Sequence, residues 1–235
     1  PAKFSITEHS FYRPMQILMN SAAPAALEVV WNFFSQGGWF MVPILACSLV
    51  AVAVVVYKVM TLGKGMIIPA ALEAEVEKMA ARAEAGEVAS LESRFRAGES
   101  SLARLCAVAF DSADRPQGEV QEVVQSAARE EIVNMHSGMP ILEVVITIAP
   151  LLGLLGTTSG LVLVFANVGQ GADPAMVGQG IAMALNTTVA GLVVAVPAVI
   201  AHSHFNRKIE TMSARLEVLM GKVVARCQQY TTFNQ

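Results

Sequence analysis

Three long blocks of the chain contain no Asp, Glu, Lys or Arg, and the charged residues gather between and after them. These blocks cover residues 29–57, 144–172 and 174–206. A helix needs about 20 apolar residues to cross the hydrocarbon core of a bilayer, so each block is long enough to span it. A buried helix of a soluble protein is the alternative, but three such blocks would be hard to bury within 235 residues. We therefore predict three transmembrane helices, at residues 37–62, 139–168 and 175–206.

The region between the first two spans, residues 63–138, holds most of the charge. Its apolar positions recur at helical spacing, with Glu and Lys on the other face. Residues 111–118, DSADRPQG, have the composition of a loop. A helix resumes at Glu119 and is expected to run nearly unbroken into the second span, with Gly138 and Pro140 marking a point where it could kink. The pattern predicts a helical domain outside the membrane.

The rest of the chain completes an all-α architecture. Residues 207–235 predict a C-terminal helix, because apolar side chains recur there at steps of three and four: Ile209, Met212, Leu216, Leu219, Val223 and Cys227. Residues 1–36 mix apolar, polar and charged side chains, and this composition predicts an interfacial segment before the first span. Residues 169–174 predict a short turn. The sequence thus indicates an all-α membrane protein whose three transmembrane helices extend into a cytoplasmic helical domain.

Basic residues predict the orientation of the spans. Lys58 and Lys64 follow the first span, and Arg207 and Lys208 follow the third, whereas the turn at residues 169–174 contains no Lys or Arg. Loops on the cytoplasmic side of a membrane carry an excess of Lys and Arg. We therefore expect the charged domain and the C-terminus in the cytoplasm, with the N-terminus and the short turn across the membrane.

Small residues form a stripe on each of the last two spans. Such stripes let two helix backbones approach closely, which is how helices associate when lipid offers no hydrophobic gain. The pattern predicts an antiparallel hairpin with close helix–helix contact. Its packing positions are Gly153, Gly156 and Gly160 on the second span and Gly180, Ala184, Gly191 and Ala195 on the third.

Hydroxyl and amide side chains accompany these stripes. The candidates to line a polar path are Thr147, Thr157 and Thr158 on the second span and Asn186, Thr187 and Thr188 on the third. For any single Ser or Thr the alternative is a hydrogen bond back to its own helix, with no further role. Thr157 and Thr188 fall on or beside the small-residue stripes, which favours the path for these two. An asparagine is costly in lipid, so Asn186 should face protein or water.

No carboxylate lies within residues 144–172 or 174–206 of the last two spans. A proton relay through a membrane usually needs a titratable side chain. Glu143, at the start of the second span, is the nearest carboxylate, and it is either an interfacial residue or a candidate channel mouth. His202 and His204 lie two residues apart and point to different sides of a helix, so they do not form a metal site together.

Catalytic and cofactor chemistry is not indicated. The sequence contains no nucleophile–base set, P-loop or metal signature, so we expect neither an enzyme nor a cofactor or metal. Cys47, Cys106 and Cys227 are far apart and follow no disulfide framework. The net charge of −3 and the lack of a basic patch argue against nucleic-acid binding.

Four segments resemble the MotA/TolQ/ExbB proton-channel family. They are GGWFMVPILACSLVAVAVVVYKV at 37–59, APLLGLLGTTSGLVLVF at 149–165, GIAMALNTTVAGLVVAVPAV at 180–199, and the basic pair at 207–208. The three-span layout is similar to ExbB and TolQ. The resemblance implies a homopentamer in the bacterial inner membrane, with a periplasmic N-terminus. Two single-span ExbD/TolR-like subunits would sit in the central pore and supply the protonatable aspartate, and the family's pore threonines fall on Thr157 and Thr188.

The resemblance also implies a function. Such a stator subunit uses the proton-motive force to energise TonB-dependent outer-membrane transport, delivering work to a TonB- or TolA-like periplasmic protein. A Tol-Pal envelope motor, or another motor of the family in gliding or defence, is the sibling alternative. A structural membrane scaffold without ion flux is the alternative of another class. One position departs from the family, because Met183 stands where ExbB and TolQ commonly carry a glutamate.

Overall fold

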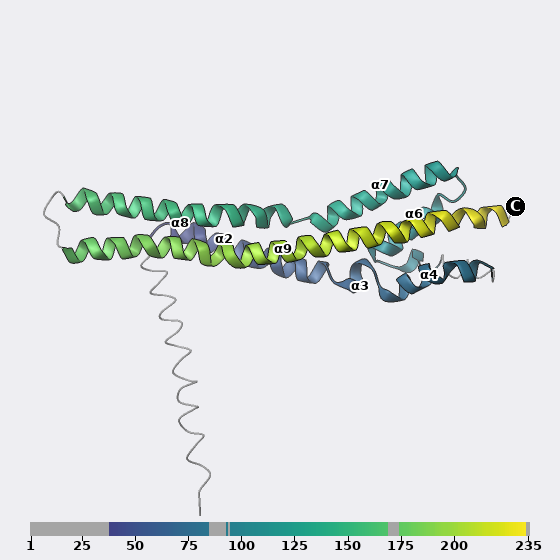
Figure 1. The fold of residues 1–235 in the computed structure, drawn as a ribbon, viewed down its shortest axis with the longest axis horizontal. Helices are drawn as coiled ribbons and strands as arrows, with labels where there is room; N and C mark the ends of the chain where they lie inside the picture. Colours follow the sequence, from purple (N-terminus) through teal and green to yellow (C-terminus); the bar gives the residue numbers. More distant parts are fainter. Residues whose placement is uncertain (1–37, 85–92, 94, 169–173, 234–235) are drawn as a thin grey trace, which may run out of the picture. The chain divides into compact units, whose positions relative to one another are not determined.

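The computed structural model describes residues 38–84, 93, 95–168 and 174–233. Within these ranges the chain forms helices joined by turns, and no strand is present, which confirms the all-α class (Figure 1). The helices are α2 (Met41–Thr61), α3 (Lys64–Ile67), α4 (Ala70–Glu84), α6 (Ser101–Asp111), α7 (Gln117–His136), α8 (Met139–Val168) and α9 (Pro174–Phe233). The expected interfacial segment at 1–36 and the turn at 169–173 lie outside the described residues.

Three helical stretches are long and apolar enough to cross a membrane. They are Met41–Thr61, Gln117–Ala166 and Pro174–Arg226. Large aliphatic side chains stand exposed along them; Leu49, Val162 and Val193, for example, are 65%, 67% and 65% exposed. Exposed apolar surface on this scale marks contact with lipid or with other protein chains. The protein is therefore a multi-pass membrane protein.

The chain divides into two compact units. The first, which we call the hairpin unit, consists of residues 1–48 and 147–195. Its described part contains the N-terminal end of α2, most of α8 and the first part of α9. Met41 and Ile44 of α2 form a small buried cluster with Ala190 of α9, against which Leu152 and Val194 pack. The start of α2 thus lies against the α8–α9 pair.

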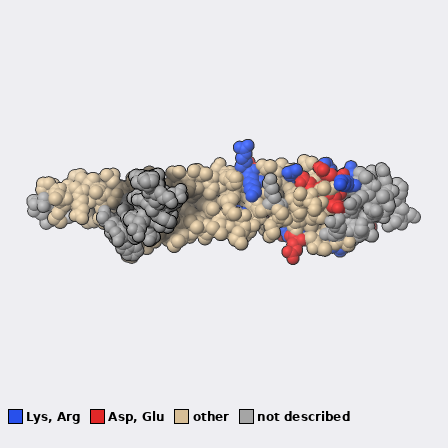
Figure 2. All heavy atoms as spheres, turned by 90° about the horizontal axis from the view of Figure 1, so that it is seen from below, with Lys and Arg blue, Asp and Glu red and all other residues tan. Residues whose placement is uncertain are grey.

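The second unit, the charged unit, consists of residues 49–146 and 196–235. Its core is built from the apolar faces of α4, α6, α7 and α9. Fully buried members include Leu105 on α6, Val120 on α7 and Leu216 and Val223 on α9. Charged side chains line the outside of this unit, and Figure 2 shows them gathered over one part of the chain while the remaining described surface in that view is uncharged. The amphipathic pattern therefore folds into a packed helical domain.

One expectation about helix continuity turned out differently. The helix from Glu119 into the second span is not continuous, because residues 137–138 form a turn between α7 and α8. Gly138 there has φ +81°, a left-handed conformation that ends an α-helix and that glycine adopts without strain. Pro140 lies in the first turn of α8, where its missing N–H is not needed. In contrast, α9 continues without a break from the third span through the C-terminal segment.

Candidate functional site

The glycines of α8 lie where α9 comes closest. A Cβ atom built on Gly156 would lie 2.5 Å from Oγ1 of Thr187, and one built on Gly160 would lie 2.9 Å from Cβ of Ala184. A Cβ on Gly153 would come within 2.8 Å of the Thr187 carbonyl oxygen. Contacts this short leave no room for any larger residue, so the two backbones touch because these positions are glycine.

The glycines of α9 likewise lie where α8 comes closest. A Cβ on Gly191 would lie 2.5 Å from the carbonyl oxygen of Ala149. A Cβ on Gly180 would collide with the side chain of Val164. Ala195, one turn beyond Gly191, is 5% exposed. Gly191 therefore lies against the N-terminal part of the small-residue stripe on α8, and Gly180 lies against its C-terminal part. This pairing shows that α8 and α9 run antiparallel.

Two threonine hydroxyls lie at one backbone carbonyl in this contact, and a third lies beside one of them. Thr187 Oγ1 donates to the Ala184 carbonyl oxygen at 2.7 Å and also lies 3.3 Å from the carbonyl oxygen of Gly153. Thr188 Oγ1 lies 3.1 Å from the same Gly153 oxygen and 3.4 Å from Oγ1 of Thr157. We call Thr157, Thr187 and Thr188 the threonine cluster. The cluster joins α8 and α9 through hydroxyls on both helices.

The members of the threonine cluster differ in how far they are exposed at the surface of the hairpin unit. Thr187 is 2% exposed and sealed between the helices, whereas Thr157 and Thr188 are half-buried. The hydroxyl of Thr188 carries one proton, so it donates either to Gly153 or to Thr157 at a given moment. Thr157 Oγ1 meanwhile can donate to the Leu154 carbonyl at 2.7 Å. Thr157 and Thr188 therefore form a polar pair that reaches the surface of the hairpin unit.

The other predicted polar residues do not join this cluster. Thr158 is exposed, and its hydroxyl donates to the Leu155 carbonyl of its own helix at 3.0 Å. Thr147 is exposed and Asn186 is half-buried. Glu143 is exposed and belongs to the charged unit. Close contact thus brings together three of the six candidates for a polar path.

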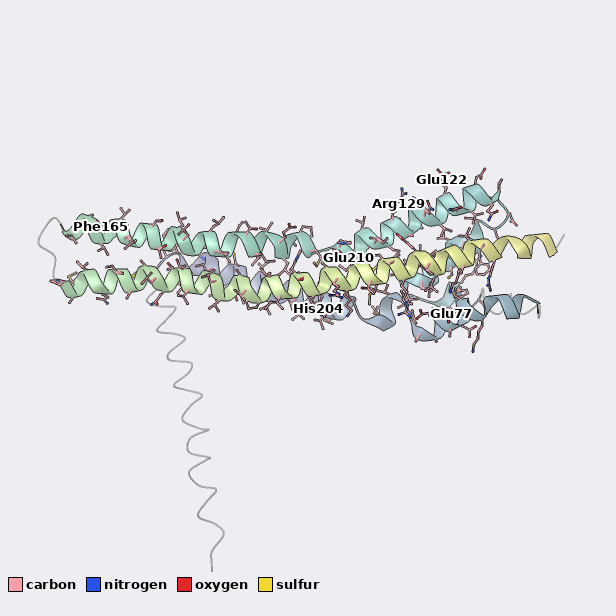
Figure 3. The ribbon with its side chains drawn as sticks, viewed as in Figure 1. Glu77, Glu122, Arg129, Phe165, His204 and Glu210 are labelled. Carbon is pink, nitrogen blue, oxygen red and sulfur yellow. The ribbon has the colours of Figure 1, made fainter. Side chains whose placement is uncertain are left out.

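Met183, at the position where the resemblance implies a glutamate, lies beside the start of α2. Its side chain is 43% exposed. A Cβ atom built on Gly38 would lie 2.7 Å from Cε of Met183, and Gly38 has φ +68°. The thioether therefore fills space that the glycine leaves open. Phe165, which is labelled in Figure 3, lies near the C-terminal end of α8 and is 71% exposed.

The chemistry available to the hairpin unit follows from these groups. Hydroxyls donate and accept hydrogen bonds, but they do not take up or release a proton at neutral pH. The sequence of residues 144–172 and 174–206 contains no carboxylate. The described residues also contain no group of three or more His, Cys, Asp or Glu that could hold a metal ion. The site can donate and accept hydrogen bonds, and residues 144–172 and 174–206 around it supply no carboxylate.

One buried cation in the charged unit was missed by sequence reasoning. Lys58, interpreted above only as a marker of orientation, is 1% exposed, and its Nζ donates to the carbonyl oxygen of Met135 at 2.6 Å. Met135 lies in the last turn of α7, where carbonyl groups lack partners within the helix. The Lys58 ammonium therefore caps α7 just before the turn at Gly138. The only signal in the sequence was a lysine placed before the end of an apolar helix.

A second polar link in the charged unit joins α6 to α7. The guanidinium of Arg104 binds Glu131 through two hydrogen bonds, from Nε to Oε1 at 2.7 Å and from Nη2 to Oε2 at 2.8 Å. The hydrogen bond from Arg104 lowers the pKa of Glu131, and the bond from Glu131 raises the pKa of Arg104. The two-pronged geometry orients both side chains and stabilises the charged forms.

Comparisons with known proteins place the chain among membrane channels. Residues 64–218 match the MotA/TolQ/ExbB proton channel family. A biopolymer-transport ExbB homolog of Methanothermobacter thermautotrophicus is 31% identical over 121 residues, 52% of this chain and 43% of that protein. The ExbB-like 1 biopolymer transport protein of Synechocystis is 31% identical over 174 residues, 69% of this chain and 65% of that protein. The Tol-Pal system protein TolQ of Pseudomonas aeruginosa is 34% identical over 134 residues, 56% of this chain and 55% of that protein. The match thus spans less than two thirds of each relative.

Proposed function

Because the chain belongs to the MotA/TolQ/ExbB proton channel family, we propose that it is an inner-membrane channel and stator subunit. It uses the proton-motive force to energise TonB-dependent transport across the outer membrane. The single observation that carries the proposal is the threonine cluster on a tightly packed α8–α9 pair. Thr157 and Thr188 place hydroxyls at the surface of stretches of α8 and α9 that contain no Asp, Glu, Lys or Arg.

The proposed assembly is a homopentamer around a central pore. The exposed aliphatic surface of α8 and α9 supports contacts with other chains or with lipid. Because Thr157 and Thr188 cannot store a proton, the acid comes from a partner: two single-span ExbD/TolR-like subunits that each bring an aspartate. The N-terminus lies in the periplasm, and the charged unit and the C-terminus lie in the cytoplasm.

The energy for this work comes from the membrane potential. One elementary charge that crosses 100 mV releases about 2.3 kcal/mol. Several protons per step are therefore needed for substantial mechanical work on a TonB- or TolA-like protein. Thr157 and Thr188 contribute by hydrating the path beside the partner's acid, so their effect is on the rate of proton passage.

Two variants test the path. Thr157→Val and Thr188→Val remove one hydroxyl each. Thr61→Val is the matched control, because among the described residues the Thr61 hydroxyl donates only to the Tyr57 carbonyl of its own helix, at 2.9 Å. We expect proton uptake by cells that express the chain with its partner to fall roughly tenfold in both test variants, if each hydroxyl lowers the barrier by about 1.4 kcal/mol. The control should conduct normally, and all three should assemble as wild type does.

Normal proton uptake in both test variants would contradict the pore role of the two threonines and would favour the structural membrane scaffold without ion flux.

The TolQ relative supports a second candidate, a Tol-Pal envelope motor. Affinity purification of the full assembly separates the two motors, because a TonB-like protein co-purifies in one case and a TolA-like protein in the other.

A further inference from the structure

A basic cavity lies within the charged unit, between α9 and the chain around α3 and α4. Its volume is about 650 Å³, within the range of typical ligand pockets. Its walls combine four basic side chains with several apolar ones. The lining residues on α9 are His204, Arg207, Lys208, Thr211, Met212 and Arg215, and those opposite are Gly65, Ile68, Ala70 and Glu73.

Two of the cations in this cavity have no counter-ion in the described part of the chain. Arg215 is paired, since its Nε lies 2.8 Å from Oε1 of Glu73. For Arg207 and Lys208 the described residues offer no such ion pair. Glu210, labelled on α9 with His204 in Figure 3, accepts a hydrogen bond from Asn206 at 2.9 Å and does not line the cavity. The cavity therefore carries an uncompensated positive charge.

The cavity also lies at a specific place along α9. Residues 174–206 contain no charge, and Arg207 is the first charged residue after them. Arg207 and Lys208 therefore follow directly on the charge-free stretch of α9, which is where a membrane-spanning helix reaches the lipid headgroups. Ile68 and Met212 add apolar surface to the same cavity, which a small soluble anion would not need.

We propose that this cavity holds the phosphate headgroup of an anionic phospholipid from the adjacent leaflet. Arg207 and Lys208 bind the phosphate, and Ile68 and Met212 contact the glycerol and the first part of the acyl chains. Basic pockets beside transmembrane helices are suited to anionic headgroups, because each cation adds attraction at the membrane surface. The proposal depends on the membrane position of α9 and not on proton conduction.

The test compares lipid binding in two charge-matched double variants. Arg207→Gln/Lys208→Gln removes both cations of the cavity. Arg115→Gln/Lys222→Gln removes the same two charges from exposed positions that do not line it. Each protein is reconstituted in vesicles of phosphatidylcholine alone or of phosphatidylcholine and phosphatidylglycerol in equal amounts. Retained phosphatidylglycerol is then counted by native mass spectrometry. We expect the cavity variant to bind it about 30-fold more weakly, and the control to match wild type.

A second measurement uses the wild-type protein, so it does not depend on how the variants fold. Phosphatidylglycerol should slow amine-selective labelling of Lys208, with Lys222 as the internal control in the same sample. Equal labelling of Lys208 in both kinds of vesicle overturns the proposal. So does equal loss of lipid in both double variants, or full competition by inorganic phosphate. A change of oligomeric state in the cavity variant alone would assign the cavity to a contact between copies of this chain instead.

Discussion

The contact between Gly191 and α8 makes the sharpest prediction about the hairpin. In a Gly191→Ala variant the new Cβ would lie 2.5 Å from the Ala149 carbonyl oxygen and 3.3 Å from Cα of Pro150. Both are backbone atoms, so no side-chain rotation can relieve the clash. Ordinary van der Waals contact begins at 3.4 Å, so the helices would have to separate by about 0.9 Å at this point.

The separation also weakens the neighbouring polar contacts. If the same displacement reached Thr188, its 3.1 Å bond to the Gly153 carbonyl would lengthen to about 4.0 Å, beyond hydrogen-bonding range. Interhelical hydrogen bonds in membranes contribute about 0.6 kcal/mol each. Overpacking of a well-packed contact costs about 1–3 kcal/mol. We therefore expect Gly191→Ala to lower the free energy of unfolding by about 1–3 kcal/mol relative to its control.

The control is Gly178→Ala, because a Cβ on Gly178 meets no atom within 4 Å. Both substitutions occur within α9 and gain the same helix propensity of about 1 kcal/mol, so the difference between them isolates the packing cost. The assay is unfolding by a denaturing detergent in mixed micelles, followed by circular dichroism. Equal unfolding free energies for the two variants would show that α8 and α9 do not touch at Gly191, and the close-packed hairpin would be refuted.

Two further predictions concern the charged unit. Lys58→Met leaves the buried Met135 carbonyl without its donor and should destabilise the protein by about 1–3 kcal/mol, measured by thermal unfolding. Glu131→Gln breaks the link to Arg104, which is half-exposed, so the loss at neutral pH should be at most about 1 kcal/mol. Because the folded-state pKa of Glu131 is lowered, the stability from this pair is complete above its ordinary value of 4.5 and is lost as pH falls through the folded-state value. Melting temperature against pH should therefore fall less steeply at the acid end for Glu131→Gln than for wild type.

Each of these predictions has a contrary outcome. A higher melting temperature for Lys58→Met would mean that burying the ammonium costs more than its hydrogen bond contributes. Parallel pH curves for wild type and Glu131→Gln would show that the carboxylate is not stabilised by folding. Asp111→Asn serves as a control for the second case, because its partner Arg96 and Asp111 itself are both more than half exposed.

Much of the fold could be predicted because it follows from local composition. The lengths of the charge-free blocks indicated the spans, and helical periodicity indicated the amphipathic face of α9, whose Leu216 and Val223 are indeed fully buried. Helix ends were harder. Gly138 and Pro140 were both recognised as potential breaks, but only the structure shows that Gly138 ends α7 while Pro140 begins the next helix harmlessly.

Part of the candidate site was also within reach of the sequence. Steps of three and four among Gly153, Gly156 and Gly160 indicated which face of α8 meets a neighbour. The same spacing did not tell which threonines face the neighbouring helix. Adjacent side chains on a helix point in directions about 100° apart, so one can face the partner helix while the next does not. Thr187 is sealed inside the contact, Thr188 reaches Thr157 across it, and Thr158 points outward.

The sequence by itself determined that this protein crosses a membrane with three helices. It also determined that residues 144–172 and 174–206 carry small residues and hydroxyls but no carboxylate. These properties depend on residue type and on spacing along one helix, and both can be read from the amino-acid sequence. Only the tertiary structure decided which hydroxyls meet and that Lys58 caps α7. It also decided that Arg207 and Lys208 face a cavity with Ile68. Each of these depends on the register between segments far apart in the chain, and that register is set by packing rather than by any local pattern.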